Sequence, residues 1–419
     1  MHSDQNTTPA PSGHMPMHVW RMIFAGLSAS FIGIGLARFA YTPLLPALIQ
    51  AHWFSQSEAV YLGAANLAGY LIGAMMARPL AARLTNVRVL RAMEMLVALA
   101  FFACAFPVSV SWFFAWRLLS GLAGGTIMVL VAATVLPHVP ESRKGIVSGA
   151  VFLGLGLGVA ASGTVVPLLL LLGLRETWLG LGGICLVLAA VNWNGWPQGS
   201  PVQGSATAAA TASSAQPPLM AGSGFLLIYI AYALMALGLV PAMIFLVDFI
   251  ARGLGAGTHL GSLFWILYGV GAMLGPPLYG FLVDRIGARA AVRLLVLLQA
   301  LAIMGLAVSS SHLLIALLTI VIGTFPPGIV PLVLAWIREK APGDGAAQNI
   351  AWSKATIVFA ASQAVGGYGY SAIFSHSEGN HRLLFELGAT ALAIALAADI
   401  IFWFFRWEIS PKRTARDAA

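Results

Sequence analysis

The chain has 419 residues, of which 59% are hydrophobic and only 9% are charged, and its formal net charge is +8. Soluble domains carry about 25% charged residues, so this composition excludes a water-soluble protein and indicates a chain that crosses a membrane many times. In such a chain the basic residues report on membrane topology rather than on a nucleic-acid partner, and Cys104 and Cys185 are expected to be buried thiols without a disulfide.

Twelve segments are apolar over the roughly 20 residues that an α-helix needs to cross a bilayer. We predict helices at 20–48, 58–81, 90–108, 112–136, 145–172, 177–194, 224–250, 259–282, 290–308, 313–336, 346–374 and 382–406. No Lys or Arg occurs before the first helix, and eleven helices follow it. We therefore expect the first helix to be retained rather than cleaved as a signal peptide.

These helices form two predicted bundles of six, at 20–194 and 224–406. The segment between them, 195–223, is rich in Ala, Ser, Thr, Gln, Pro and Gly and has no charged residue, a composition typical of flexible linkers. Short tails at 1–19 and 407–419 complete the organisation. The prediction is an all-α membrane protein with twelve transmembrane helices in two bundles.

The basic residues predict the orientation. With both termini on one side of the membrane, sixteen Lys and Arg residues lie on that side and three, Arg175, Arg252 and Arg382, lie on the other. Cytoplasmic loops of membrane proteins carry an excess of Lys and Arg. The distribution therefore predicts that both tails and the linker are cytoplasmic.

The two predicted bundles repeat at an offset of 198 positions. The pattern Leu-Gly, nine residues, Gly-Ala-Met, three residues, Pro-Leu begins at Leu62 and again at Leu260. The same offset pairs Gly125 with Gly323. Two parallel six-helix repeats with a binding cavity between them at the middle of the membrane are the plan of one class of secondary transporters. The sequence therefore predicts two pseudo-symmetric bundles.

The turn after the predicted eighth helix reads Gly280-Phe-Leu-Val-Asp284-Arg285-Ile-Gly287-Ala-Arg289. It resembles the signature loop of the major facilitator superfamily, G-x-x-x-D-R-x-G-x-R, and the resemblance to that superfamily extends over all twelve helices. The resemblance implies that the acid and the arginines form an ion-pair network that closes the cytoplasmic side. It also implies that the glycines let neighbouring helices approach closely.

The matching turn of the first bundle departs from this pattern. Asn86 stands at the position that corresponds to Asp284. An amide can accept a hydrogen bond, but it cannot neutralise an arginine. We therefore expect the second-bundle loop to carry these ion pairs alone.

The first predicted helix contains the pattern Gly33-x-Gly35-x-x-Arg38-Phe39-x-Tyr41-x-x-x-Leu45-Pro46. This pattern resembles the YbfB/YjiJ-type bacterial branch of the superfamily. The resemblance implies a multi-pass protein of the bacterial inner (plasma) membrane. It also implies a buried arginine in the first helix as a feature of the branch.

Arg38 lies near the middle of the first predicted helix, where an arginine costs roughly 2.5–3.5 kcal/mol on insertion scales. Its repeat partner at the offset of 198 is Ala236, and no acid is expected at its depth. The centre of the protein should therefore be positive, which favours an anionic solute such as a small organic carboxylate. The alternative is a structural arginine that is held by an aromatic ring or a carbonyl oxygen.

Four further residues are predicted to share the substrate site with Arg38. Tyr41 falls on the same helical face, and Asn66 is an amide deep in a span that needs a partner. Arg117, followed by glycines one helical turn apart, resembles another signature of the superfamily. Arg117 and Lys354 either face the site or extend their charged ends to the membrane surface.

The acids are candidates for a second role. Asp399 and Glu386 both fall in the twelfth predicted helix, and they are the candidates for proton coupling. The prediction is a monomeric secondary transporter that moves a small, anionic organic solute by alternating access. A co-transported or exchanged proton and membrane lipid are its other expected partners.

Two other functions are considered. A proton-coupled multidrug or metabolite exporter is the rival within transport, and a glycine-rich fifth helix favours it. A membrane-embedded transferase is the alternative from another class. All nine histidines fall in the N-terminal tail or in loops, without metal-ligand spacing or a catalytic His/Asp pair. We therefore expect no enzymatic activity, cofactor or metal.

Overall fold

The computed structural model describes residues 16–140, 143–197 and 223–409. Most of the predicted linker and of both predicted tails lies outside the described residues. The described residues are helical almost throughout, and they form twelve long helical segments, as predicted. Ten of the twelve are long and apolar enough to cross a membrane. The other two, α5 (Asn86–Cys104) and α14 (Gly345–His376), carry more polar residues.

The N-terminal half comprises the first six segments. The first segment is divided into α1 (Met17–Ser30), the π-helix η1 (Phe31–Leu36), α2 (Ala37–Phe39) and α3 (Tyr41–Gln50). After it come α4 (Gln56–Leu84), α5, α6 (Val110–Val135), α7 (Lys144–Leu170) and α8 (Leu174–Asn192). The C-terminal half comprises α10 (Ser223–Asp248) with the π-helix η4 (Phe249–Gly253), α11 (Gly257–Ile286), α12 (Ala288–Val308), α13 (His312–Lys340), α14 and α15 (His381–Ile409).

Local sequence explains where several helices begin and end. Ser55 and Glu58 form a capping box at the start of α4, in which each side chain bonds the backbone of the other. Asp344 caps α14 by accepting a 2.9 Å hydrogen bond from the backbone N–H of Ala347. Gly287, with a φ of +79°, ends α11 in a conformation that favours glycine.

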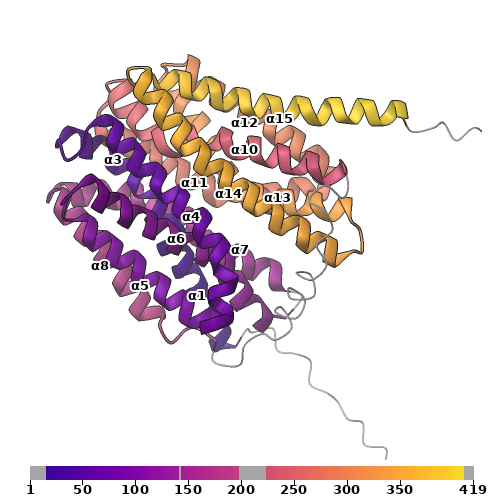
Figure 1. Ribbon diagram of the computed structural model, residues 1–419, viewed down its shortest axis with the longest axis horizontal. Coiled ribbons are helices and arrows are strands. Elements are labelled where there is room, and N and C mark those ends of the chain that lie inside the picture. The colour runs from indigo at the N-terminus through magenta and orange to yellow at the C-terminus, as the bar shows by residue number, and fades with distance from the viewer. Residues whose placement is uncertain (1–15, 141–142, 198–222, 410–419) are drawn as a thin grey trace, which may run out of the picture.

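The two halves are assembled in the same way, and both are visible in Figure 1 as the indigo-to-magenta and the orange-to-yellow groups. In the N-terminal half α4 packs against α6, and in the C-terminal half α11 packs against α13. A Cβ atom at Gly73 would lie 2.0 Å from the carbonyl oxygen of Leu122, and one at Gly271 would lie 2.1 Å from that of Ile320. Both residues of the second pair follow those of the first by 198 positions, so the repeat in the sequence is also a repeat in packing.

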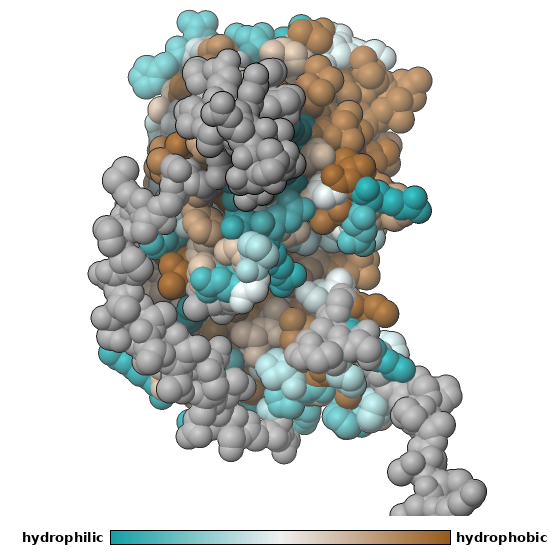
Figure 2. Space-filling view, turned by 90° about the vertical axis from the view of Figure 1, so that its right-hand side faces the viewer, coloured by the Kyte–Doolittle hydropathy of each residue, from teal (hydrophilic) through white to brown (hydrophobic). Residues whose placement is uncertain are grey.

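Many large apolar side chains are exposed around the helices. Leu301 and Leu171, for example, are 60% and 82% exposed. Figure 2, which views the end of the molecule at the right of Figure 1, shows hydrophobic residues along one edge and hydrophilic residues nearer the middle. Soluble monomers rarely expose so much contiguous apolar surface, whereas the hydrocarbon of a bilayer accommodates it. The protein is therefore a multi-pass membrane protein.

The two halves touch through α7 and α11, through α4 and α14, and through α3 and α10. Four of the contacts between them are Thr42 with Met243, Ser162 with Trp265, Tyr61 with Tyr368, and Gln56 with Arg252. Thr42 lies toward the end of the first helical segment, and the other residues lie at the start of α4 or α11, toward the end of α7, α10 or α14, or in η4. That end of the molecule is opposite to the start of α1 and the end of α15, and we call it the distal end.

Candidate functional site

Arg38 lies in α2, directly after the π-helix η1. Glycines let this part of the first segment pack closely: a Cβ at Gly35 would lie 2.7 Å from the Cα of Gly158 in α7. The side chain of Arg38 is half-buried, and it extends from the N-terminal half to the C-terminal half. Its Nη2 donates a 2.8 Å hydrogen bond to Oε1 of Gln363 in α14 and lies 3.9 Å from the sulfur of Met243 in α10.

Aromatic rings surround the guanidinium group of Arg38. Its central carbon lies 5.2 Å from the centre of the Tyr70 ring and 5.5 Å from that of Phe39. The rings of Trp265 and Tyr268 stack on each other at 4.7 Å, and both contact Phe39. Ring faces of this kind stabilise a cation through their quadrupole.

Two polar atoms at this site are unpaired. Nε of Arg38 and the hydroxyl of Tyr268 are buried and have no hydrogen-bond partner among the described residues. A buried polar group without a partner costs free energy, and a ligand or a water molecule that reached it would remove that cost. The site therefore offers donors that its own side chains do not use.

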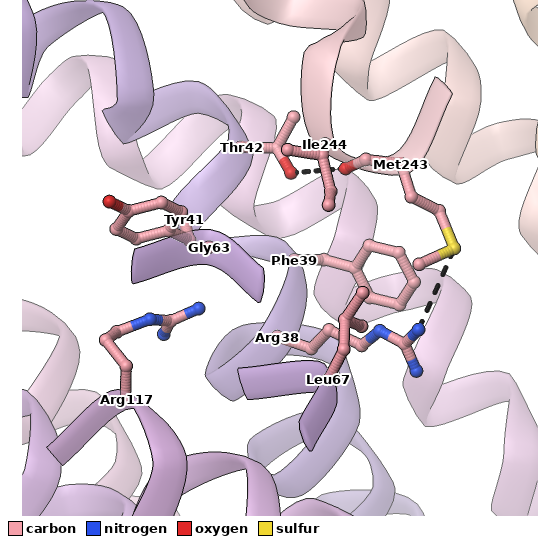
Figure 3. A pocket seen from close by; sticks show the side chains of 9 residues that line it. All are labelled: Arg38, Phe39, Tyr41, Thr42, Gly63, Leu67, Arg117, Met243 and Ile244. Carbon is pink, nitrogen blue, oxygen red and sulfur yellow. Dashed lines mark hydrogen bonds between the residues drawn. The ribbon is translucent and has the colours of Figure 1, made fainter. Parts of the chain in front are cut away.

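A cavity of about 20 Å³ lies beside Arg38, and this is room for about one water molecule. Its lining comes from both halves: Arg38, Phe39, Tyr41, Thr42, Gly63, Leu67 and Arg117 in one, and Met243 and Ile244 in the other. Figure 3 shows that the guanidinium of Arg38 points toward Met243, whereas that of Arg117 lies on the far side of the cavity, near Tyr41. The cavity is therefore too small for an organic molecule.

Arg117 is buried within the N-terminal half, at 2% exposure, and does not extend to the surface. Its Nη1 donates a 2.9 Å hydrogen bond to the carbonyl oxygen of Ala37, and its central carbon lies 4.4 Å from the centre of the Tyr41 ring. The hydroxyl of Tyr41 donates in turn to the carbonyl oxygen of Ala59. These contacts fix Arg117 as part of the cavity wall.

Asn66 takes part in the same cluster and does not line the cavity. Its side-chain nitrogen donates to the carbonyl oxygen of Ala37 at 3.3 Å and to the hydroxyl of Ser120 at 3.2 Å. The hydroxyl of Ser120 also donates to Ala37, at 3.2 Å. Three side-chain donors therefore converge on the carbonyl group of the residue before Arg38 and fix the backbone there.

Lys354 lies elsewhere. It is half-buried on α14, nine positions before Gln363 in the chain, which corresponds to about 13 Å along a helix. It does not line the cavity. Glu386 is exposed on α15. The structure therefore brings together Arg38, Tyr41 and Arg117 of the predicted site residues, with Asn66 directly behind them.

The signature loop lies at the other end of the molecule from the distal end. Asp284 and Arg285 are exposed at the end of α11, and Gly280 has no atom within 4 Å of the place where a Cβ would be. Arg289 donates to a carboxylate oxygen of Asp399 at 2.9 Å. Asp399 also accepts from Arg293, so it is the counter-ion of two arginines near the start of α12, of which Arg289 belongs to the signature motif.

Three features were not predicted from the sequence, although the i,i+4 spacing of Asp248 and Arg252 is a signal that it contains. Gln363 was recognisable only as one of several polar residues in the spans, and nothing in its spacing pointed to Arg38. In α5 the buried Glu94 accepts a 3.1 Å hydrogen bond from Asn192 of α8. At the distal end the buried carboxylate of Asp248 is paired with Arg252 and with His381, whose Nε2 lies 2.7 Å from Oδ2.

Comparison with known proteins gives partial matches. The chain is 32% identical over 173 residues to the 4-hydroxybenzoate transporter PcaK of Pseudomonas aeruginosa, which is 41% of this chain and 38% of PcaK. It is 29% identical over 151 residues to the uncharacterized MFS-type transporter YwfA of Bacillus subtilis, which is 36% of this chain and 35% of YwfA. The matches thus span less than two-fifths of either relative.

Solved structures match over nearly the whole chain. A D-xylose-proton symporter superposes with a TM-score of 0.72 at 15% identity, over 91% of this chain and 97% of the symporter. The inward-open xylose transporter XylE from E. coli gives 0.68 at 14% identity, over 95% and 98%. An auto-inhibited POT family peptide transporter gives 0.69 at 14% identity, over 93% and 97%. Identities this low show a shared fold and no more.

A family model described as "Uncharacterised MFS-type transporter YbfB" matches residues 30–400. That range includes the first-segment glycines, Arg38, the signature loop and Asp399, and it confirms the resemblance predicted from the sequence. With the fold of the major facilitator superfamily over almost the full length, the chain belongs to the YbfB family of MFS-type transporters.

Proposed function

We propose that this transporter moves a small organic anion and that Arg38 supplies the charge that binds it. The observation that carries the proposal is a half-buried arginine between the two halves that forms no ion pair with an acid of the described residues. A cation in such a place costs free energy unless an opposite charge reaches it. An entering carboxylate would supply that charge. Arg117 and Lys354 would attract the anion through their positive potential without holding it.

The rings around Arg38 favour a solute with a flat, apolar body. Phe39 and Tyr70 lie beside the guanidinium, the stacked pair Trp265 and Tyr268 packs against Phe39, and the unpaired hydroxyl of Tyr268 is available to a polar substituent. The name of PcaK refers to 4-hydroxybenzoate, which has these properties. Aromatic monocarboxylates are therefore the first solutes to test.

Transport would proceed by alternating access. The contacts between the halves lie toward the distal end, and the cavity beside Arg38 holds about one water molecule. The distribution of Lys and Arg favours cytoplasmic termini, and with that orientation the distal end is the outer end. The solute would then reach Arg38 from the cytoplasmic side once the halves move apart there, and from the outer side after the halves rock about the site.

We keep Asp399 and Glu386 as the candidate acids for a coupled proton. Asp399 is the first to test, because a bound proton must change contacts between helices, and Glu386 is exposed. Asp399 bridges α15 to Arg289 and Arg293 of α12. Protonation of its carboxylate would remove the charge that both arginines contact, and this would loosen the helix ends near the signature loop.

The test is a thermal-shift titration of the purified protein with benzoate and 4-hydroxybenzoate. A ligand at 100 times its Kd stabilises the folded protein by about 2.7 kcal/mol. We expect this shift for the wild type and for Arg175→Ala, which removes an exposed arginine, but not for Arg38→Ala. Arg38→Lys should bind more weakly, because an ammonium group lacks the planar fork of a guanidinium. The same shift in folded Arg38→Ala, together with unchanged transport in proteoliposomes, would contradict the proposal.

A further inference from the structure

We propose that Gln363 is an internal substitute for the solute. Its side-chain oxygen occupies, in the empty protein, the place at Arg38 that the carboxylate of the solute takes when it binds. This inference rests on the proposed function, because it assumes an anion at Arg38. It adds a residue of the C-terminal half that determines which solutes bind and that links binding to the contact between the halves.

The geometry at Arg38 supports this substitution. Gln363 is 2% exposed, and its Oε1 is the side-chain oxygen that accepts from the guanidinium group, at 2.8 Å. That bond uses Nη2, while Nε has no hydrogen-bond partner in the described part of the chain. A carboxylate can bind two nitrogens of a guanidinium at once, whereas one amide oxygen satisfies only part of that group. The arginine is therefore incompletely paired while Gln363 holds it.

Charge decides between the two partners. The bond from Arg38 to Gln363 is charge-assisted through its donor alone, whereas a carboxylate adds an opposite charge and a second acceptor oxygen, so that it can bind the guanidinium bidentately. A carboxylate can therefore displace the amide of Gln363, while a neutral solute of the same shape must compete with it on nearly equal terms. Gln363 thus disfavours neutral solutes, because they must displace it from Arg38 without the advantage of a charge.

Displacement of Gln363 would also affect the contact between the halves. Arg38 belongs to the N-terminal half and Gln363 to the C-terminal half, so their bond crosses the interface. One turn further along α14, a Cβ at Gly367 would lie 2.7 Å from Cδ1 of Leu67 in α4, so the two helices are in tight contact there. Leu67 also lines the cavity beside Arg38. A solute that pushes Gln363 away therefore acts directly on the packing of α4 against α14.

The residue type agrees with this role. Glutamate has nearly the shape of glutamine, but it would give Arg38 a permanent counter-ion. A permanent ion pair would leave no reason for an external anion to bind. Glutamine holds the arginine in the empty protein and yields to a charged solute.

The experiment measures the binding of benzoate and of its neutral analogue benzamide by thermal shift and by calorimetry. Gln363→Glu should weaken benzoate binding at least about tenfold. It should also raise the melting temperature of the empty protein, because the new ion pair joins the halves. Gln363→Met, which keeps the length and removes the acceptor, should bind benzoate at least as tightly as the wild type and should discriminate less against benzamide.

Gln348→Glu is the matched control, because it makes the same chemical change on the same helix, 15 positions before Gln363. It should leave benzoate binding unchanged. Wild-type affinity in folded Gln363→Glu, or loss of benzoate binding in Gln363→Met, would overturn the inference while the proposed function stands. If Arg38→Ala binds benzoate like the wild type, the proposed function fails as well. The two failures are therefore distinguishable.

Discussion

The guanidinium carbon of Arg117 lies 4.4 Å from the centre of the Tyr41 ring, and the two residues come from different helices of the same half. The Tyr41 hydroxyl is fixed by a 2.6 Å hydrogen bond to the carbonyl oxygen of Ala59. The charge of Arg117 is thus stabilised within the N-terminal half, whereas Arg38 reaches the other half. Two arginines that look alike in the sequence therefore have different surroundings: Arg117 is buried within one half, and the half-buried Arg38 contacts both halves.

We expect Tyr41→Leu to lower the free energy of unfolding by about 1–3 kcal/mol, since it removes a desolvated cation–π contact and a buried hydrogen bond. Tyr41→Phe keeps the ring over Arg117 and should cost about 1 kcal/mol. Unfolding in detergent gives both values. Benzoate affinity should stay within about threefold of the wild type in Tyr41→Phe. A stable Tyr41→Phe that no longer binds benzoate would show that the hydroxyl contacts the solute.

The repeated glycine contacts should be equally sensitive in both halves. Gly73→Ala and Gly271→Ala each place a Cβ about 2 Å from a backbone carbonyl oxygen, which cannot rotate away as a side chain can. Each should destabilise the protein by about 1–3 kcal/mol or more. Gly183→Ala in α8 is the control, because no atom lies within 4 Å of its new Cβ. Thermal unfolding of the three variants tests this, and similar melting temperatures for all three would contradict the prediction.

Substitution of Gly280 should affect transport without affecting folding. No atom lies within 4 Å of a Cβ at this position, so Gly280→Ala should fold normally and bind benzoate like the wild type. In alternating access, the helix ends near the signature loop would approach each other when the halves separate at the distal end. A methyl group at residue 280 would hinder that approach. We expect benzoate uptake by proteoliposomes to fall at least about tenfold, in contrast to binding. Full uptake by Gly280→Ala would mean that these helix ends do not come together at this glycine.

Asp399 and Arg289 should be energetically coupled. Asp399→Ala leaves two arginines without the carboxylate that they contact, and we expect a loss of about 1–3 kcal/mol, because both arginines are about a quarter exposed and partly screened. Arg289→Ala should cost less. A double-mutant cycle measures the coupling, and the double variant should be more stable than the sum of the single effects implies. Additive effects would indicate that the two residues do not interact in solution.

The same Asp399→Ala variant tests proton coupling. If transport remains dependent on a pH gradient in this variant, Asp399 has only its structural role at the end of α15. Glu386→Gln is the companion measurement, since Glu386 is exposed on the same helix and should have little effect on stability.

The sequence predicted the helices well because hydropathy is a local property. The greatest shift is in α5, predicted at 90–108 and observed at Asn86–Cys104. Arg91 and Glu94 count against a membrane helix by hydropathy. In the structure Arg91 donates to the carbonyl oxygen of Trp193, directly after α8, and Glu94 accepts from Asn192, the last residue of α8. Their partners lie about 100 positions away, so the sequence alone could not show that these charges are satisfied.

The candidate site was only partly predictable for the same reason. Arg38 is conspicuous as a charge in an apolar segment, but its partner Gln363 follows it by 325 positions. Asp399 stood out as an acid within a span, and it belongs with Arg289, 110 positions earlier. Hydropathy and motif spacing describe what one helix requires. They do not specify which residue of another helix meets that requirement.

The π-helix η1 sets the direction in which the side chain of Arg38 points. An α-helix turns about 100° per residue, and a π-helical turn holds one residue more within the same hydrogen-bonded loop. The start of the first segment and the segment that carries Arg38 are therefore out of phase by one residue, on either side of Phe31–Leu36. Loss of a single residue from η1 would restore a regular α-helix and would rotate the guanidinium away from Gln363 while leaving Arg38 itself in the chain. The direction in which Arg38 points thus depends on the number of residues in the first segment as well as on their identity.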